Sequence, residues 1–348
     1  MKQRVRQIDI AQAVGVSQRV VSSVLGNNPG RTFKASPAMR EKILQTAKEM
    51  GYTINQSASE LRGGSSKIVG VLINNYFTQE SQDLLFRLGE AAHGRGYHLL
   101  IGQVMDTLDD FTNYFNEFAS RSVEAVICLQ HQPLIGGSYP SIEKCIHPNL
   151  KVVYLGQPAF QTETALSVSV DHRTAYTQAV EYLHRHGARR IGFLSPNNQH
   201  PHIQDRLAGY LDGLRRCNLE PEAALQLEFS RGNVPLDEEE LSLVIHAALK
   251  AWIPGVQPDA ILATNDILAS EILRFALLHN YAVPNDFQVI GFGNLLPLAL
   301  RMHPQLSSFQ VQNGRMAEAL FKLALETETV CRRLVIPPVF VPRGSTRN

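Results

Sequence analysis

Helical hydrophobic spacing dominates the first fifty residues. Ile10, Ala11 and Val14 lie one and three positions apart and are followed by Gly15, which predicts a short helix that ends in a left-handed turn. Ser17 can cap a second helix directly afterwards. The apolar side chains of that helix recur at helical spacing, at Val20, Val21, Val24 and Leu25. Two short helices joined by so tight a turn are typical of a helix-turn-helix.

A third helix is predicted after Ser36, a good N-cap that precedes Pro37, and Gly51 closes it. Its buried stripe comprises Met39, Ile43, Ala47 and Met50. The polar loop 26–35 between the second and third helices suits contact with the backbone of a DNA duplex. A three-helix bundle with another function remains open at this point.

From residue 67 the pattern changes to short apolar runs alternating with amphipathic stretches, which is typical of parallel sheets covered by helices. Strands are expected in two sets, at 68–73, 97–101, 123–129 and 152–155, then at 191–194, 225–229, 260–263 and 289–292. Helices are expected near 81–95, 109–120, 174–186, 205–216, 238–252 and 267–279. The predicted fold class is α/β, with a three-helix helix-turn-helix headpiece and two doubly wound parallel-sheet subdomains.

Composition is that of a globular protein, since 44% of the 348 residues are hydrophobic and can supply a sizeable core. No apolar run approaches the roughly 18 to 20 residues of a membrane-spanning helix, and residues 1–10 lack the apolar segment of a secretory signal. We therefore expect a cytoplasmic protein with no membrane contact. The cysteines lack any CxxC spacing and are expected to be free thiols: Cys128, Cys145, Cys217 and Cys331.

Charge is distributed unevenly along the chain. Residues 1–65 hold ten lysines and arginines against four acidic residues, whereas the remainder holds 23 basic and 28 acidic residues. Only the N-terminal segment therefore has the sign expected of a surface that meets phosphates. Taken alone, this asymmetry fits a solvated basic face equally well.

Several motifs with independent spacings resemble those of the LacI/GalR family of transcription regulators. In the headpiece they are Asp9-Ile10-Ala11, Gly15-Val16-Ser17, Val21-Ser22-Ser23-Val24-Leu25, Gly51-Tyr52 and Asn55. In the core they lie at 182–191, 206–210, 264–266, 289–292 and 341–346. The resemblance thus spans nearly the whole chain.

The resemblance implies a homodimer in which the second helix of each headpiece enters the major groove of a near-palindromic operator in double-stranded DNA. Gln18, Arg19 and Ser23 then stand where base edges are read, because arginine can pair with guanine and glutamine with adenine. The DNA contacts expected in the headpiece are Ser17, Gln18, Arg19, Ser22, Ser23 and Arg31. Solvated helix residues are the alternative interpretation.

Residues 52–66 correspond in this resemblance to a hinge helix and a linker. Ser, Asn and Gln make the segment a poor isolated helix, so we expect it to order only on DNA. Asn55, Ala58 and Leu61 are the expected contacts, and paired Leu61 side chains would wedge open the central base step from the minor groove. A plain interdomain linker is the alternative.

The domain prediction is a headpiece at 1–51, the hinge and linker at 52–66, and a core at 67–348. The core resembles periplasmic sugar-binding proteins, in which the chain crosses three times between subdomains. With crossings near 165, 291 and 312, the N-subdomain is expected at about 67–165 and 292–312, and the C-subdomain at about 166–291 and 313–348.

The resemblance also implies a small-molecule effector, often a carbohydrate, at the carboxyl ends of the strands. The expected contacts can hydrogen-bond to hydroxyl or carboxylate oxygens, and they are Asn74, Asp171, Arg206, Asn265 and Asp266. Helix capping is the alternative for Asp171 and Asp266. The sequence departs from the family at Gly293, which stands where an effector-binding Asp is usual.

The motifs and the family resemblance together predict a DNA-binding transcription repressor that responds to a small metabolite. No HExxH, GxSxG or Walker motif occurs, and His200 and His202 are expected in a polar loop over the cleft, so we expect no enzyme activity, cofactor or metal site. One alternative is a solute-binding protein of the same core fold, which would have a signal peptide and no headpiece. Another is an enzyme that modifies a sugar with the acidic residues of the cleft.

Overall fold

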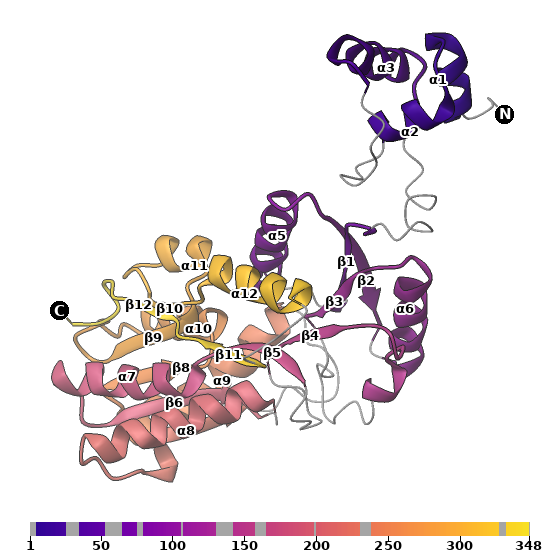
Figure 1. Ribbon diagram of the computed structural model, residues 1–348. Helices are drawn as coiled ribbons and strands as arrows, with labels where there is room; N and C mark the ends of the chain where they lie inside the picture. The colour runs from indigo at the N-terminus through magenta and orange to yellow at the C-terminus, as the bar shows by residue number, and fades with distance from the viewer. Residues whose placement is uncertain are drawn as a thin grey trace. The chain divides into compact units, whose positions relative to one another are not determined.

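A computed structural model describes residues 5–25, 35–52, 65–74, 79–105, 107–129, 142–156, 165–197, 200–229, 238–326 and 332–347 (Figure 1). The chain divides into two compact units, residues 1–66 and 67–348, and each is described by itself.

The first unit contains three helices, α1 (Gln7–Val14), α2 (Gln18–Leu25) and α3 (Pro37–Glu49). The Ser36 side chain accepts a hydrogen bond from the Met39 amide at 3.3 Å and so caps α3 as predicted. The helices pack on one small core formed by Ile10, Ala11, Val14, Val21, Ile43 and Ala47. The three helices of the predicted helix-turn-helix headpiece are confirmed.

The first sheet of the second unit is six-stranded and parallel throughout, in the order β11-β5-β4-β3-β1-β2. Its strands are β1 (Ile68–Asn74), β2 (His98–Val104), β3 (Ala125–Cys128), β4 (Val152–Leu155), β5 (Leu166–Val170) and β11 (Arg333–Ile336). Helices α5 (Gln79–His93) and α12 (Asn313–Leu325) share a hydrophobic cluster with one face of this sheet. Helix α6 (Leu108–Ser120) and the short η1 (Ile142–Cys145) pack on the other face.

The second sheet has the order β12-β10-β9-β8-β6-β7, and only its edge strand β12 is antiparallel. Its strands are β6 (Ile191–Pro196), β7 (Gln226–Phe229, after the short η2 at Ala223–Leu225), β8 (Ala260–Ala263), β9 (Gln288–Gly293), β10 (Ser307–Gln310) and β12 (Val339–Val341). Helices α7 (His172–Arg185) and α8 (Pro201–Arg216) cover one face. Helices α9 (Glu238–Val256), α10 (Asp266–Leu278) and α11 (Leu296–Arg301) cover the other.

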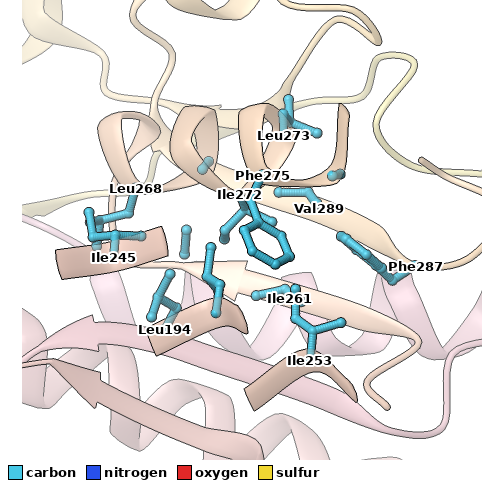
Figure 2. Packing of buried hydrophobic residues seen from close by; sticks show 14 of the residues in the cluster. Leu194, Ile245, Ile253, Ile261, Leu268, Ile272, Leu273, Phe275, Phe287 and Val289 are labelled. Carbon is cyan, nitrogen blue, oxygen red and sulfur yellow. The ribbon is translucent and has the colours of Figure 1, made fainter. Parts of the chain in front are cut away.

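Two neighbouring residues of β9 pack into the hydrophobic cores on opposite faces of the second sheet. Val289 packs with α9 and α10, where Figure 2 shows it beside Phe275 and Ile272, whereas Ile290 packs with α7 and α8. Both faces of the sheet are therefore buried, which explains the continuous apolar runs in the sequence. The prediction of two doubly wound parallel-sheet subdomains is confirmed.

The predicted subdomain bounds differ from the sheets that form. β5 belongs to the first sheet, so the first crossing follows residue 170 instead of 165. No crossing occurs near 291, because β9 continues through α11 into β10 of the same sheet. The chain returns to the first sheet between β10 and α12, in the opposite sense to that predicted near 312, and crosses again between β11 and β12. Pairing between strands far apart in the sequence, such as β5 with β11, decides this, and local periodicity does not predict it.

Candidate functional site

The turn between α1 and α2 is built by Gly15. Its φ of 78° lies in the left-handed region, and its amide donates to the Ala11 carbonyl at 2.9 Å. The Val16 amide donates to the same carbonyl at 3.0 Å, so the chain reverses within two residues. This geometry starts α2 immediately after α1, as a helix-turn-helix requires.

The predicted reading positions lie at the start of α2. Ser17, Gln18 and Arg19 are exposed, while Val21 on the same helix is fully buried. Ser23 is half-buried, and its hydroxyl donates to the Val20 carbonyl at 2.8 Å. Ser22 is half-buried too. The helix thus exposes the two longest polar side chains of the predicted set, and one of its serines is engaged with the helix backbone.

Other predicted DNA contacts lie outside the described residues. These are Arg31 in the loop before α3, and Asn55, Ala58 and Leu61 in the predicted hinge. In the core, Asn74 ends β1 at the carboxyl edge of the first sheet, and its side chain is likewise not described.

Arg206, on α8, lies at the carboxyl edge of the second sheet and is only 7% exposed. Its guanidinium donates to the carbonyl of Thr264, which directly follows β8, and lies 4.0 Å from the ring centre of Phe292 in β9. Nε also donates to Nδ1 of His172 at 3.3 Å. Arg206 therefore connects α8 with the ends of two strands and the start of α7.

Two histidines that the sequence analysis did not assign to the site complete this group. The His172 ring centre lies 5.2 Å from that of Phe292 and 5.9 Å from that of His202. Burial among surrounding protein lowers the pKa of His172 well below its usual value, and Arg206 and His202 lower it further. The side chain of His202 is partly accessible to solvent. The protein packed around the ring lowers its pKa most, and the charges of Arg206 and His200 lower it further. Both rings are therefore neutral near pH 7.

His202 belongs to helix α8 and not to a loop as predicted. The helix begins at Pro201, four residues before the predicted start, so His202 and Arg206 stand four positions apart on one face. That spacing was readable in the sequence once Pro201 was taken as the first helical residue. His172 could have been found from its place directly after the helix cap Asp171.

Two predicted effector contacts act as helix caps. Asp171 Oδ1 accepts from the Thr174 amide at 3.0 Å at the start of α7. Asn265 Oδ1 accepts from the Leu268 amide at 2.8 Å at the start of α10. Each cap satisfies a helix amide that would otherwise lack a partner, so both side chains already have a structural role.

Asp266 is fully buried and holds neighbouring segments together. Its Oδ1 accepts from the Ser308 hydroxyl and its Oδ2 from the Leu295 amide, both at 2.6 Å. Burial raises its pKa, while these two hydrogen bonds and then the charges of Arg343 and Arg206 oppose the rise. A Cβ at Gly291 would collide with Oδ1, which explains the glycine in that strand.

The departure from the family pattern is visible at the end of β9. Gly293 has no side chain at this position. The side-chain oxygen of the next residue, Asn294, accepts a hydrogen bond from Arg343 at 2.6 Å. The backbone amide of Asn294 donates to the Ser308 hydroxyl at 3.0 Å. Asn294 is buried in these contacts. The carboxylate usual in the family has no substitute at these two positions.

Within the described ranges, no group of three or more His, Cys, Asp or Glu side chains could hold a metal ion. A search of the described helices likewise finds none that is long and apolar enough to cross a membrane.

Comparison with known proteins finds similar proteins along nearly the whole chain. Residues 180–346 match the family described as periplasmic binding protein-like domain. The ribose operon repressor of Bacillus subtilis is 25% identical over 98% of both chains. The HTH-type transcriptional repressor CytR of Escherichia coli is 26% identical over 82% of this chain and 79% of its own.

The fold is also that of a solved structure, a Lac repressor dimer bound to operator and the anti-inducer ONPF. That structure is 21% identical, covers 99% of each chain and has a TM-score of 0.81. Likeness over almost the full length therefore includes the headpiece as well as the two-sheet core. Over nearly its whole length the chain is therefore similar to transcription regulators of the LacI family.

Proposed function

We propose that this protein is a homodimeric transcription repressor whose headpieces bind the two halves of a near-palindromic operator. The observation that carries the proposal is the start of α2, where Gln18 and Arg19 are exposed while Val21 is buried in the headpiece core. The N-terminal end of such a helix can enter the major groove while its hydrophobic face stays buried in the headpiece core. The excess of basic residues in 1–65 adds the attraction to phosphates that any such complex needs.

In this proposal different side chains contact different parts of the DNA. Arg19 and Gln18 reach base edges, because each can form two parallel hydrogen bonds to one base. Ser17, Ser22 and Ser23 contact the DNA along the same helix, and Arg31 meets the backbone. Asn55, Ala58 and Leu61 enter the minor groove as a hinge helix when DNA is bound. These further contacts are proposed from the resemblance of the headpiece and hinge motifs to those of the LacI/GalR family.

The core is proposed to bind a small metabolite at the carboxyl edges of the sheets and to couple that binding to the headpieces. Arg206 is the best-supported contact because it connects three segments at that edge. Asn74 stands at a strand end, and Asp171 and Asn265 stand at helix starts. Asp266 is better explained by its buried structural hydrogen bonds.

We further propose that the protein acts by binding and not by catalysis, in the cytoplasm where it can reach DNA. Two relatives that match most of its length, the ribose operon repressor and CytR, are named as repressors. A solute-binding protein of the same core fold is less well supported, because such a protein would have no use for the helix-turn-helix.

The experiment that tests this function is selection of a random duplex library with the full-length protein at near-physiological salt, followed by sequencing of the bound DNA. A near-palindromic motif is the expected result, and its half-site spacing should be close to one helical turn of DNA or a multiple of it. Recovery of only salt-sensitive binding without a motif would reject the operator-binding function and favour a solute-binding one.

A further inference from the structure

Helix α10 carries a stripe of four side chains on its outer side. The inner side of the helix packs into the core, as Figure 2 shows for Ile272. On the outer side, Ile267 and Leu278 are 45% and 60% exposed, and Glu271 and Arg274 lie between them in the sequence. We call Ile267, Glu271, Arg274 and Leu278 the α10 stripe, because steps of four, three and four residues place them on one face of a helix.

The two charged side chains of the α10 stripe are held in place from the neighbouring helix α9. The Ser242 hydroxyl on α9 donates to Glu271 Oε2 at 2.6 Å and accepts from Arg274 Nη1 at 2.9 Å. His246, also on α9, has its Nε2 at 3.0 Å from the same carboxylate oxygen. All of these contacts use Oε2 and Nη1, and the Arg274 side chain is 57% exposed. The centre of the stripe therefore presents a negative and a positive group in fixed positions.

The order of residue types in the α10 stripe is self-complementary. From one end it is apolar, acidic, basic, apolar, and from the other end the acidic and basic members exchange places. When two copies of α10 lie antiparallel across a twofold axis midway between positions 272 and 273, Ile267 faces Leu278 of the second copy. Glu271 then faces Arg274 of the second copy, and each contact occurs twice. A parallel pair would instead set each charge against its own kind, which is unfavourable.

Further exposed leucines extend this surface at both ends of the stripe. The start of α11 lies beside the start of α10, because the Leu295 amide donates to Asp266 at 2.6 Å. The exposed side chains of Leu296 and Ile267 therefore belong to the same end of the surface. At the other end, Leu277 is exposed beside the last residue of α10. In an antiparallel pair these two apolar ends meet and remove each other from water, where a contiguous apolar patch is unfavourable.

We propose that the α10 stripe is a contact surface for a second copy of this chain, in which the two α10 helices lie antiparallel across a twofold axis. The inference rests on the proposed homodimer and names a surface that forms it. A twofold contact requires each residue type to find its complement on an identical surface, whereas a different partner protein would not need that arrangement. The pairs of Glu271 with Arg274 between the copies fix the register, and the apolar ends supply buried area.

Sedimentation equilibrium of the full-length protein without DNA measures the dissociation constant of the dimer. Leu278→Glu should raise this constant at least about tenfold, because the new charge faces Ile267 of the second copy and loses water without a partner. Ile267→Lys should raise it in the same way from the other side of the contact. The double variant Ile267→Lys/Leu278→Glu should bind itself at least about fivefold more tightly than Leu278→Glu, since the introduced lysine and glutamate then face each other between the copies. Within one chain the two positions lie about 16 Å apart along the helix, so only a contact between copies accounts for this recovery.

Leu44→Glu is the matched control, because it makes the same change at an exposed position of the headpiece helix α3. It should leave the dissociation constant unchanged, and circular dichroism should show the helix content of the wild type in every variant. The proposal is overturned if Leu278→Glu dimerises like the wild type, or if the double variant dimerises no better than Leu278→Glu. A dimer that persists through these changes would remove only this surface and leave the proposed dimeric repressor intact. A wild type that stays monomeric up to about 100 µM, a weak affinity, would remove both.

Discussion

The Asp266 carboxylate accepts a 2.6 Å hydrogen bond from the hydroxyl of Ser308, and this pair connects the start of α10 to β10 inside the core. The second carboxylate oxygen accepts from the Leu295 amide, so two buried donors depend on one side chain. Asp266→Ala should lower the free energy of unfolding by about 2 to 5 kcal/mol, because buried donors without partners are costly.

Urea denaturation of the core measures this effect, and Asp171→Ala is the matched control. Asp171 caps α7 at a half-exposed position, so its loss should cost about 1 kcal/mol. Equal costs for the two variants would contradict a structural role for Asp266.

Helices α7 and α8 contact each other closely at Gly209. A Cβ at this position would collide with the backbone carbonyl of Arg173 on α7. Gly209→Ala should therefore destabilise the core by about 1 to 3 kcal/mol, as overpacking does. Gly89→Ala in α5 is the control, since no described atom lies within 4 Å of its added Cβ. That change should stabilise the protein by about 0.5 to 1 kcal/mol through helix propensity, and thermal unfolding would reveal the opposite signs.

The pKa of His172 predicts a pH dependence of stability. Its pKa in the folded protein is lowered, so the unfolded chain binds more protons once the pH falls below the usual histidine value of about 6.5. The stabilising contribution of the neutral ring is complete above that pH and is lost as the pH falls toward the folded pKa. His172→Asn, which keeps an acceptor for Arg206, should lose no stability by this route.

The measurement compares unfolding free energies of the wild type and His172→Asn from pH 7.5 to 5.5. Their difference should shift in favour of the variant by up to about 1.4 kcal/mol per pH unit below 6.5. A difference that stays constant with pH would show that His172 titrates normally in the folded state.

Arg19→Ala should weaken binding to the selected operator by about 1 to 3 kcal/mol and relax the preference at one base pair, because one bidentate contact to a base is lost. Lys48→Ala removes an exposed basic residue from α3 and serves as the control, with its base preference intact. Sequencing of DNA selected by each variant makes the comparison. An unaltered motif for Arg19→Ala would exclude Arg19 as a base-reading residue.

Leu61→Ala should reduce binding to the operator more than binding to random DNA. The change removes the proposed wedge in the minor groove and leaves the phosphate contacts in place. Fluorescence anisotropy with both duplexes gives the two affinities, and Leu61→Ile, which keeps a branched apolar side chain, is the conservative control. Equal losses on both duplexes would remove the argument for a hinge helix.

Much of the architecture could be predicted from local patterns. The spacing of Ile10, Val14 and Val21 around Gly15 predicted the helix-turn-helix, because these side chains belong to the small headpiece core. Apolar runs such as 260–263 indicated strands buried on both faces, and they are. The resemblance to the LacI/GalR family lay in short motifs of the headpiece and the core.

Only the tertiary structure decided which sheet each late strand joins and which polar groups meet. β10 and β11 are both four residues long, yet they lie in different sheets, because the strands with which they pair are set by the tertiary structure. Asp266, which was predicted to meet an effector, accepts a hydrogen bond from Ser308, 42 positions away, and local pattern did not predict that contact. Nor did local pattern predict that His172 and His202 meet beside Arg206. Hydrophobic periodicity in the sequence indicates the environment of a single segment. A functional site forms where residues of several segments meet in the tertiary structure.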